Sequence, residues 1–327
     1  MKRAFELDQT SLVKEFKNLG KVLDRFIRSH DTTFLNEWTF VSQLRSAISR
    51  SGLPFGLAED TYGLSPYDLV FNQIARYHPT QTIYREYLIQ ESIAKCLPEK
   101  AVAFGECPTN AARADLVWVN GLSTVFEIKS AYDTLKRTEK QVKSYFDVFE
   151  EVYIVAPIRH IEKLIGILPS ECGYIAVDHE PGSLPKFERI KAASKHGFIS
   201  PILQASMLTV KELREALERD CKQPGNRIEL EHEFASLCTD IANERFKTAL
   251  RNRKSSAWRN YCEQAVELPP LVRDYFFRYK FRDFFLQYFR DNRIHSSSAS
   301  SPTTSSWSGK ESGIPYACDK FSIIRVK

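Results

Sequence analysis

One segment of this 327-residue chain, EVYIVAP at residues 151–157, is an almost unbroken apolar run. Such a run is typical of a β-strand that is buried on both faces, and this burial requires helices above and below the sheet. Helical patterns precede and follow the run, at residues 133–150 and 158–169, and Asp133 is the expected N-cap of the first. This alternation predicts an α/β domain with a mixed central sheet flanked by helices.

Further short segments are rich in β-branched and aromatic residues, which favours strands. They are AVAFGEC (101–107), ADLVWV (114–119), TVFEIKS (124–130), GYIAVD (173–178) and a possible edge strand, KFERIKAA (186–193). Helical patterns also cover residues 82–97 and 209–219. Together these segments predict one α/β unit.

Changes in sequence texture divide the chain into four regions. These are a helical region at 1–80, the α/β core at 81–221, a second helical region at 222–294 and a low-complexity tail at 295–327, in which we expect residues 295–315 to be disordered. An aromatic and arginine-rich stretch, 272–293, has three readings: a core helix, a base-stacking surface or an interface with a partner. We therefore expect any homo-oligomer or protein partner to bind through the terminal helical regions.

The composition limits the functional classes. The net charge of +5 permits a polyanionic partner without requiring one. Seven widely spaced cysteines without a CxxC motif favour neither a disulfide framework nor a structural zinc site, so we expect a reducing cytoplasm. The sequence shows no signal-peptide pattern, no apolar run long enough to span a bilayer and no phosphate-binding GxxxxGK[ST] loop.

Three charged residues in two adjacent strand patterns carry the candidate chemistry. Glu127 and Lys129 are two positions apart, so they point to the same face of a strand. The turn decides whether Asp115 joins them. A two-residue Asn120-Gly121 turn would place Asp115 opposite Phe126, whereas a three-residue connection places it opposite Glu127. We predict the second arrangement.

Two carboxylates that meet in this way form a hard-oxygen site suited to Mg²⁺ or Mn²⁺, and the backbone carbonyl of Ile128 is a natural extra ligand. The metal would activate water, and Lys129 would orient that water and stabilise charge in phosphodiester hydrolysis. The alternative is an ordinary cluster of charges across neighbouring strands.

The core resembles the PD-(D/E)XK nuclease superfamily, and most closely an under-characterised bacterial branch of it. The resemblance covers roughly residues 81–220. The matching residues are Arg113-Ala114-Asp115-Leu116, Glu127-Ile128-Lys129-Ser130, Asp133-Thr134-Leu135, Arg137, Gln141 and Tyr145. It implies a restriction-endonuclease-like core with a mixed four-stranded sheet. It also implies metal ligation by Asp115 and Glu127, with Lys129 as the catalytic lysine. Ala114 stands where the proline of the family name would be.

The resemblance also suggests supporting residues. Gln141 and Tyr145, spaced i, i+4 on one helix face, are similar to the Q-x-x-x-Y motif that lines the site in RecB-like nucleases. Ordinary, partly buried polar residues are the alternative. Arg137 and Arg113 are candidates for nucleic-acid contact. Some relatives carry one more acidic ligand on the helix before the sheet, and the candidate here is Glu86, with Glu91 and Glu106 as rivals.

Three hypotheses follow. The first is a Mg²⁺-dependent nuclease that hydrolyses phosphodiester bonds, with DNA as the expected substrate. The second is a catalytically silent module with the same fold that binds nucleic acid or a protein. The third is a helical scaffold with an α/β insert, which predicts that Asp115 and Glu127 face apart.

Overall fold

A computed structural model describes residues 75–76, 79–93, 101–218, 225–264 and 273 of the chain. The helices predicted in region 1–80, apart from residues 75–76, and the tail at 295–327 lie outside these residues. So does the aromatic stretch at 272–293, apart from Arg273.

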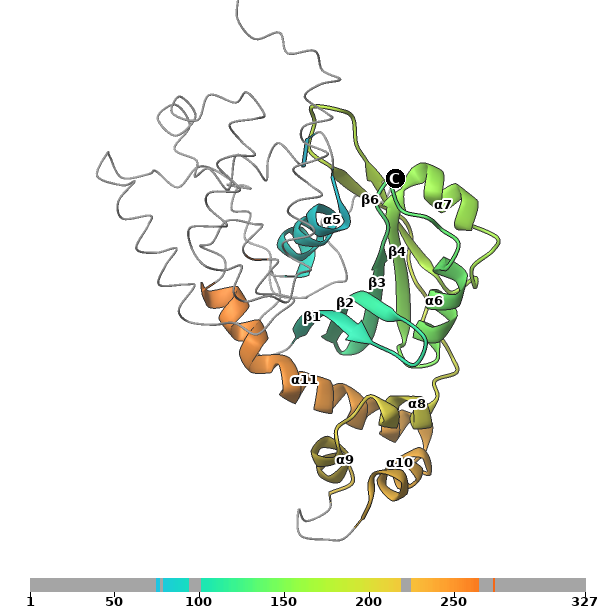
Figure 1. Cartoon of the computed structure of the whole chain (residues 1–327), viewed down its shortest axis with the longest axis vertical. Helices are drawn as coiled ribbons and strands as arrows, with labels where there is room; N and C mark the ends of the chain where they lie inside the picture. Colours follow the sequence, from blue (N-terminus) through green and yellow to red (C-terminus); the bar gives the residue numbers. More distant parts are fainter. Residues whose placement is uncertain (1–74, 77–78, 94–100, 219–224, 265–272, 274–327) are drawn as a thin grey trace, which may run out of the picture.

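The described residues form an α/β fold around one six-stranded sheet with the strand order β1-β2-β3-β4-β5-β6 (Figure 1). Neighbouring strands are antiparallel except for β3–β4 and β4–β5, which are parallel. The strands are β1 Val102–Pro108, β2 Arg113–Asn120, β3 Leu122–Ile128, β4 Glu151–Pro157, β5 Gly173–Asp178 and β6 Lys186–Lys191. The predicted α/β class and mixed sheet are confirmed, but the sheet has six strands rather than four.

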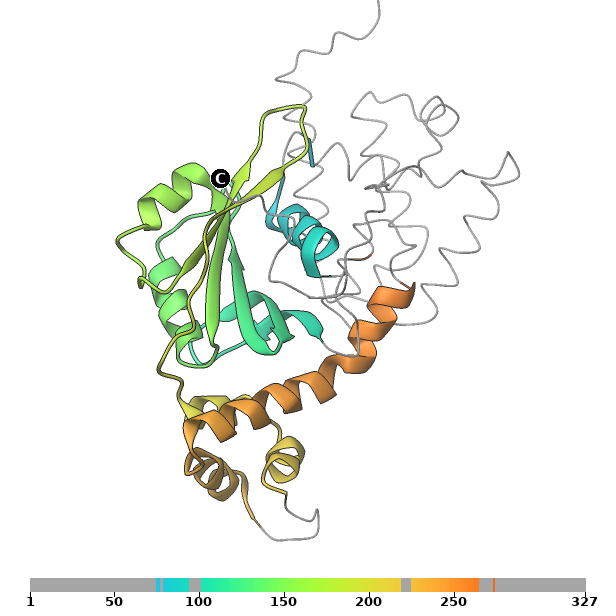
Figure 2. The same cartoon turned by 180° about the vertical axis from the view of Figure 1, so that it is seen from behind.

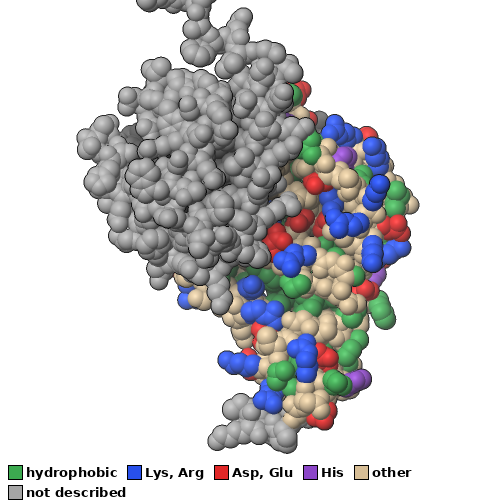
Figure 3. All heavy atoms as spheres, viewed as in Figure 1, with side chains coloured by type: hydrophobic (Ala, Val, Ile, Leu, Met, Phe, Trp, Pro, Cys, Tyr) green, Lys and Arg blue, Asp and Glu red, His purple; other side chains and the backbone are tan. Residues whose placement is uncertain are grey.

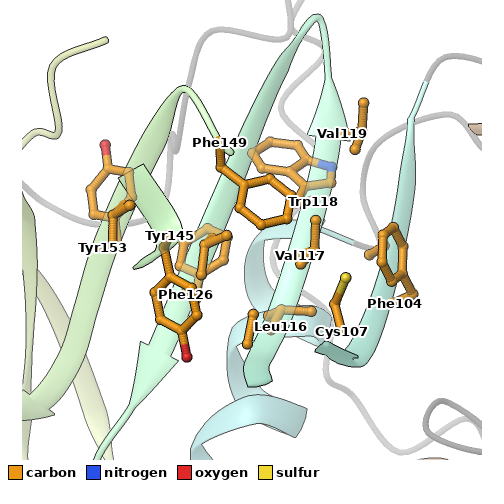
Figure 4. Packing of buried hydrophobic residues seen from close by; sticks show 14 of the residues in the cluster. Phe104, Cys107, Leu116, Val117, Trp118, Val119, Phe126, Tyr145, Phe149 and Tyr153 are labelled. Carbon is orange, nitrogen blue, oxygen red and sulfur yellow. The ribbon is translucent and has the colours of Figure 1, made fainter. Parts of the chain in front are cut away.

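Strand β4 lies inside the sheet, and its residues are buried from Glu151 to Ala156, as its apolar run predicts. β6 is exposed along most of its length and forms the predicted edge. Figure 4 shows the aromatic side chains that fill the core. Among them, Phe126 of β3 stacks on Tyr153 of β4 with ring centroids 5.5 Å apart. Burying large aromatic rings in this way is a major source of folding free energy.

Helices cover both faces of the sheet. Figures 1 and 2 place α5 (Gln81–Leu88) on one side and α6 (Thr138–Phe146) and α7 (Ile158–Leu164) on the other. A short π-helix, Ile89–Ile93, continues α5. The predicted helix at 133–150 is shorter than expected. It begins at Thr138, because the Asp133 carboxylate binds the Ser130 amide in a turn instead of capping the helix.

The second helical region packs against the sheet as part of the same hydrophobic core. It follows α8 (Pro201–Ser206) and α9 (Val210–Ala216), and its described part contains α10 (Arg227–Ala235) and the long α11 (Thr239–Gln264). α11 runs past β1 and β2 and contacts α8 and α9 (Figure 1). No helix in the described part of the chain is long and apolar enough to cross a membrane.

A buried lysine joins α11 to the β2–β3 turn. Lys247 Nζ donates to the carbonyl of Gly121 at 2.7 Å and lies 3.2 Å from Glu150 Oε2. Both charged side chains are almost completely buried. Burial alone would raise the pKa of Glu150, but the Ser123 amide, which donates to its carboxylate, and the Lys247 ammonium outweigh this effect and lower the pKa. Glu150 is therefore held as a carboxylate beneath the turn.

Candidate active site

The connection between β2 and β3 determines whether the two acids meet. Asn120 pairs with Leu122, and the pairs continue to Leu116 with Phe126. Gly121 stands at the tip with φ of +74°, which glycine adopts without strain. Continuing this register by one residue places Asp115 opposite Glu127. The predicted three-residue connection is therefore confirmed, and the facing-apart arrangement of the scaffold hypothesis is contradicted.

The last backbone pair between β2 and β3 is Leu116 with Phe126. Beyond this pair, the side chain of Asp115 rather than its backbone binds β3. Its Oδ2 accepts a hydrogen bond from the Ile128 amide at 2.8 Å. The carboxylate thus lies at the end of the pairing between the two strands. Burial and the nearby Glu127 carboxylate raise the pKa of Asp115 to about 8, although Arg85 and Lys129 act in the opposite direction.

Lys129 and Tyr145 hold the Glu127 carboxylate from two directions. Lys129 Nζ lies 2.5 Å from Glu127 Oε1, and Tyr145 Oη lies 2.6 Å from Oε2. The tyrosine hydroxyl is also 2.9 Å from the carbonyl of Arg113, so its single proton serves one acceptor at a time. Burial, followed by the charges of Glu127 and Asp115, raises the pKa of Tyr145 and keeps it protonated. The hydroxyl of Tyr145 therefore binds Glu127 directly, and the charges of both carboxylates raise its pKa.

Helix α6 supplies the second partner of the lysine. Gln141 Oε1 accepts from Lys129 Nζ at 3.1 Å, one helical turn before Tyr145. The i, i+4 pair predicted from the sequence therefore points toward Glu127 and Lys129. The N-cap residue Arg137 has an exposed side chain, as does Arg113, whose backbone carbonyl faces the tyrosine.

Helix α5 adds two residues that the sequence analysis missed. The Gln81 amide donates to the carbonyl of Ile128 at 2.8 Å, and the buried Arg85 lowers the pKa of Asp115. These residues are four positions apart and so lie on one helix face. That spacing is the signal that could have identified them. The Ile128 carbonyl, which we expected to bind a metal ion, thus already accepts a hydrogen bond from Gln81.

The candidate Glu86 turns away from this constellation and toward the C-terminal helices. Its Oε1 lies 3.1 Å from Arg273 Nε, and its Oε2 accepts from the Tyr261 hydroxyl at 3.3 Å. We therefore correct its assignment from metal ligand to buried ion-pair partner. Its rival Glu106 lies 3.7 Å from Arg85 Nη1 and has a left-handed backbone, with φ of 54°. The side chain of Glu91 lies outside the described residues.

The surface of the described residues carries charges of both signs. Figure 3 shows Asp and Glu side chains gathered near the middle of the described surface, with Lys and Arg side chains around them. Among the residues that the structure describes, no group of three or more His, Cys, Asp or Glu side chains is arranged to hold a metal ion. A metal here would have to rely on two carboxylates and backbone or solvent oxygen.

Comparison with known proteins places the chain in a family. The model of the family described as bacteriophage P4 protein cII matches residues 82–270, more than half of the chain. The chain belongs to the bacteriophage P4 protein cII family. The matched residues include Asp115, Glu127 and Lys129, and they extend through α11.

One curated member of the cII family is protein cII of Enterobacteria phage P4. It is 29% identical to this chain over 107 residues, which cover 33% of this chain and 40% of the phage protein. The chain thus spans less than half the length of this curated relative. No solved structure matches the chain.

Proposed function

We propose that this cII-family chain is a metal-dependent nuclease that hydrolyses phosphodiester bonds, with DNA as its substrate. One observation carries the proposal: two carboxylates on neighbouring strands, Asp115 and Glu127, meet at the end of the β2–β3 ladder, with the Lys129 ammonium 2.5 Å from the second. The resemblance of this segment to PD-(D/E)XK nucleases supports the same reading.

The donor set fits Mg²⁺ or Mn²⁺ in its chemistry. It offers two carboxylates and the Ile128 carbonyl, all of them hard oxygen donors, and each oxygen has lone pairs beyond those in its present hydrogen bond. The pKa of Asp115 is raised chiefly by burial and then by the Glu127 charge, and the positive charges of Lys129 and Arg85 do not offset these two effects. A bound divalent ion would supply this missing positive charge and a water of lowered pKa.

The remaining residues position these groups. Lys129, held between Glu127 and Gln141, presents a fixed positive charge to a phosphate and can orient the attacking water. Tyr145 fixes the orientation of the Glu127 carboxylate, and Gln81 ties α5 to the same strand end. These contacts keep the charged groups in place before substrate arrives, which lowers the cost of reorganisation during the reaction.

A second function, nucleic-acid or protein binding without catalysis, is favoured by one observation. Both oxygens of the Glu127 carboxylate already have a partner within the protein, Lys129 Nζ on Oε1 and the Tyr145 hydroxyl on Oε2. A metal titration by calorimetry distinguishes the two functions, followed by incubation of plasmid and single-stranded DNA with Mg²⁺ or Mn²⁺. We expect metal binding and cleavage. Neither metal binding nor cleavage under any of these conditions would leave the binding module as the better description.

Replacing Tyr145 with phenylalanine should destabilise the protein without creating a cavity. The change removes a hydroxyl that binds the Glu127 carboxylate at 2.6 Å, and a hydrogen bond to a charged group contributes about 1.5–3 kcal/mol. Urea unfolding in EDTA measures the loss. A fall in cleavage rate should accompany it, because the carboxylate loses its fixed orientation. Unchanged stability would show that the hydroxyl is satisfied equally well by solvent in the unfolded chain.

Metal binding should release a proton near neutral pH. The pKa of Asp115 is raised to about 8, so in the metal-free protein this carboxyl binds a proton that the cation must displace. Affinity for Mg²⁺ is expected to rise with pH until about 8 and then level off. Calorimetry in two buffers of different ionisation enthalpy counts the protons released.

The raised pKa of Asp115 also predicts how the stability of the metal-free protein changes with pH. Metal affinity should rise with pH, whereas this contribution to stability should fall. A raised carboxyl pKa favours the folded state at low pH, and this contribution is lost as the pH rises from about 4 to about 8. Asp115→Asn in EDTA should therefore lose less stability than the wild type over this range. Parallel pH profiles for the two proteins would contradict the shift.

A further inference from the structure

The loop between β3 and α6 is built to keep a fixed shape. It begins with Lys129, and its first turn is closed by the Asp133 carboxylate. Asp133 Oδ2 accepts from both the amide and the hydroxyl of Ser130 at 2.6 Å, and the Asp133 amide donates to the Ser130 carbonyl at 3.2 Å. Three hydrogen bonds within four residues leave this turn little conformational freedom.

A residue of the neighbouring helix holds the same turn from outside. Arg159 of α7 donates from Nη2 to the carbonyl of Ala131 at 3.1 Å. The amide of the next residue, Tyr132, donates to the Ser130 hydroxyl at 3.3 Å. The backbone at Tyr132 is therefore held by two side chains, Ser130 of the same turn and Arg159 of α7.

This fixed turn presents an aromatic ring to solvent. Tyr132 is 53% exposed, although the chain buries most of its other described aromatic residues. Further along the same loop, Lys136 and Arg137 are also exposed and precede α6. An exposed aromatic ring followed by cations is the combination that binds single-stranded nucleic acid, because the ring stacks on a base and the cations contact the backbone.

We propose that Tyr132 stacks on an unpaired base of the substrate strand, and that Lys136 and Arg137 contact its phosphates. This inference rests on the proposed function and makes it more specific. Tyr132 follows Lys129 by three residues, so their Cα atoms are at most about 10 Å apart and the ring is attached close to the proposed site. The ring can stack only on a base whose face is not covered by a neighbouring base, and inside a regular duplex both faces are covered. The substrate is therefore single-stranded or locally unpaired.

The test measures binding apart from cleavage. Fluorescence anisotropy with a labelled single-stranded oligonucleotide, and with the matching blunt duplex, is carried out in the full chain carrying Lys129→Ala in EDTA. Adding Tyr132→Ala should weaken single-strand binding by roughly 5- to 100-fold, while Tyr132→Phe and Tyr132→Trp retain it. Duplex binding should change by less than about 2-fold, because within the duplex each base face is covered by a neighbouring base pair and only the two ends are open.

The control is another exposed aromatic residue. Phe198 is 72% exposed and lies between β6 and α8, so Phe198→Ala should leave both affinities unchanged. Replacing Lys136 and Arg137 together should reduce the salt dependence of single-strand binding, because two phosphate contacts are lost.

Several results would overturn the inference. Equal single-strand affinity with and without the Tyr132 ring would do so, as would equal weakening for single strand and duplex. Loss of binding in Tyr132→Phe would assign the effect to the hydroxyl instead. The proposed function is judged separately, by wild-type cleavage with Mg²⁺. An enzyme that cleaves DNA with no dependence on Tyr132 keeps the function and loses this specificity.

Discussion

Lys129→Ala should reduce the rate of Mg²⁺-dependent DNA cleavage by about 10²- to 10³-fold, which is the usual effect of removing one preorganised group that stabilises transition-state charge. The Lys129 ammonium is held between Glu127 Oε1 and Gln141 Oε1. Alanine at this position removes the positive charge and both contacts. The rate is measured on plasmid and on single-stranded substrate under saturating metal.

Asp115→Ala should abolish cleavage through a different defect. This variant loses a carboxylate of the proposed metal site, whereas Lys129→Ala keeps both. Calorimetry should therefore show weak or absent Mg²⁺ binding for Asp115→Ala and retained binding for Lys129→Ala. This difference in Mg²⁺ binding distinguishes a metal ligand, Asp115, from a residue that stabilises charge, Lys129.

A matched control comes from an exposed lysine on α9. Lys211 is far more exposed than Lys129, and its Nζ lies 3.7 Å from Glu215 Oε1 on the same helix. Lys211→Ala should cleave at the wild-type rate. Circular dichroism checks that each variant is folded. Equal cleavage by the wild type, Asp115→Ala and Lys129→Ala would reject the proposed active site.

The largest effect on stability is expected at the buried pair beneath the β2–β3 turn. Lys247→Ala removes the buried cationic partner of Glu150 and leaves it the more exposed Lys195, 3.2 Å from Oε1, so the loss should approach but not exceed the roughly 3–5 kcal/mol of a broken buried pair. Urea unfolding at neutral pH measures the loss. The pKa of Glu150 is lowered in the folded protein, so the wild-type advantage should shrink as the pH falls through the carboxyl range.

An exposed pair on α6 is the comparison. Lys143 and Glu139 are 2.7 Å apart at spacing i, i+4, and such exposed pairs contribute about 0.3–0.5 kcal/mol. Lys143→Ala should therefore change the free energy of unfolding only slightly. A loss at Lys247 as small as the loss at Lys143 would show that solvent reaches Glu150 once the lysine is gone.

Local patterns in the sequence predicted the strands well. All six strand segments were identified, and β4 could be placed inside the sheet because apolar residues on both faces require cover from both sides. The pairing of Asp115 with Glu127 depends on the length of the turn between their strands. Asn-Gly is compatible with turns of two lengths, and only the observed register decides between them.

Contacts between distant segments explain what the sequence did not reveal. Glu86 was assigned to the metal because nothing local shows that Arg273 and Tyr261 reach it from the C-terminal helices. The partner of Gln81 is the backbone carbonyl of Ile128, which no side-chain motif marks, so only the i, i+4 spacing from Arg85 points to this residue. Asp133 was expected to cap a helix, but aspartate also closes tight turns, and here it binds Ser130.

The turn at Gly121 aligns the two acids, and the lysine that holds its carbonyl comes from a helix more than a hundred positions later. A chimera that takes only β2 and β3 from a related protein would carry Asp115 and Glu127 without the matching lysine of α11 that binds the Gly121 carbonyl. Any shortened version that stops after residue 221 would also leave Glu150 without Lys247. We expect the sheet and α11 to be inherited as a single block.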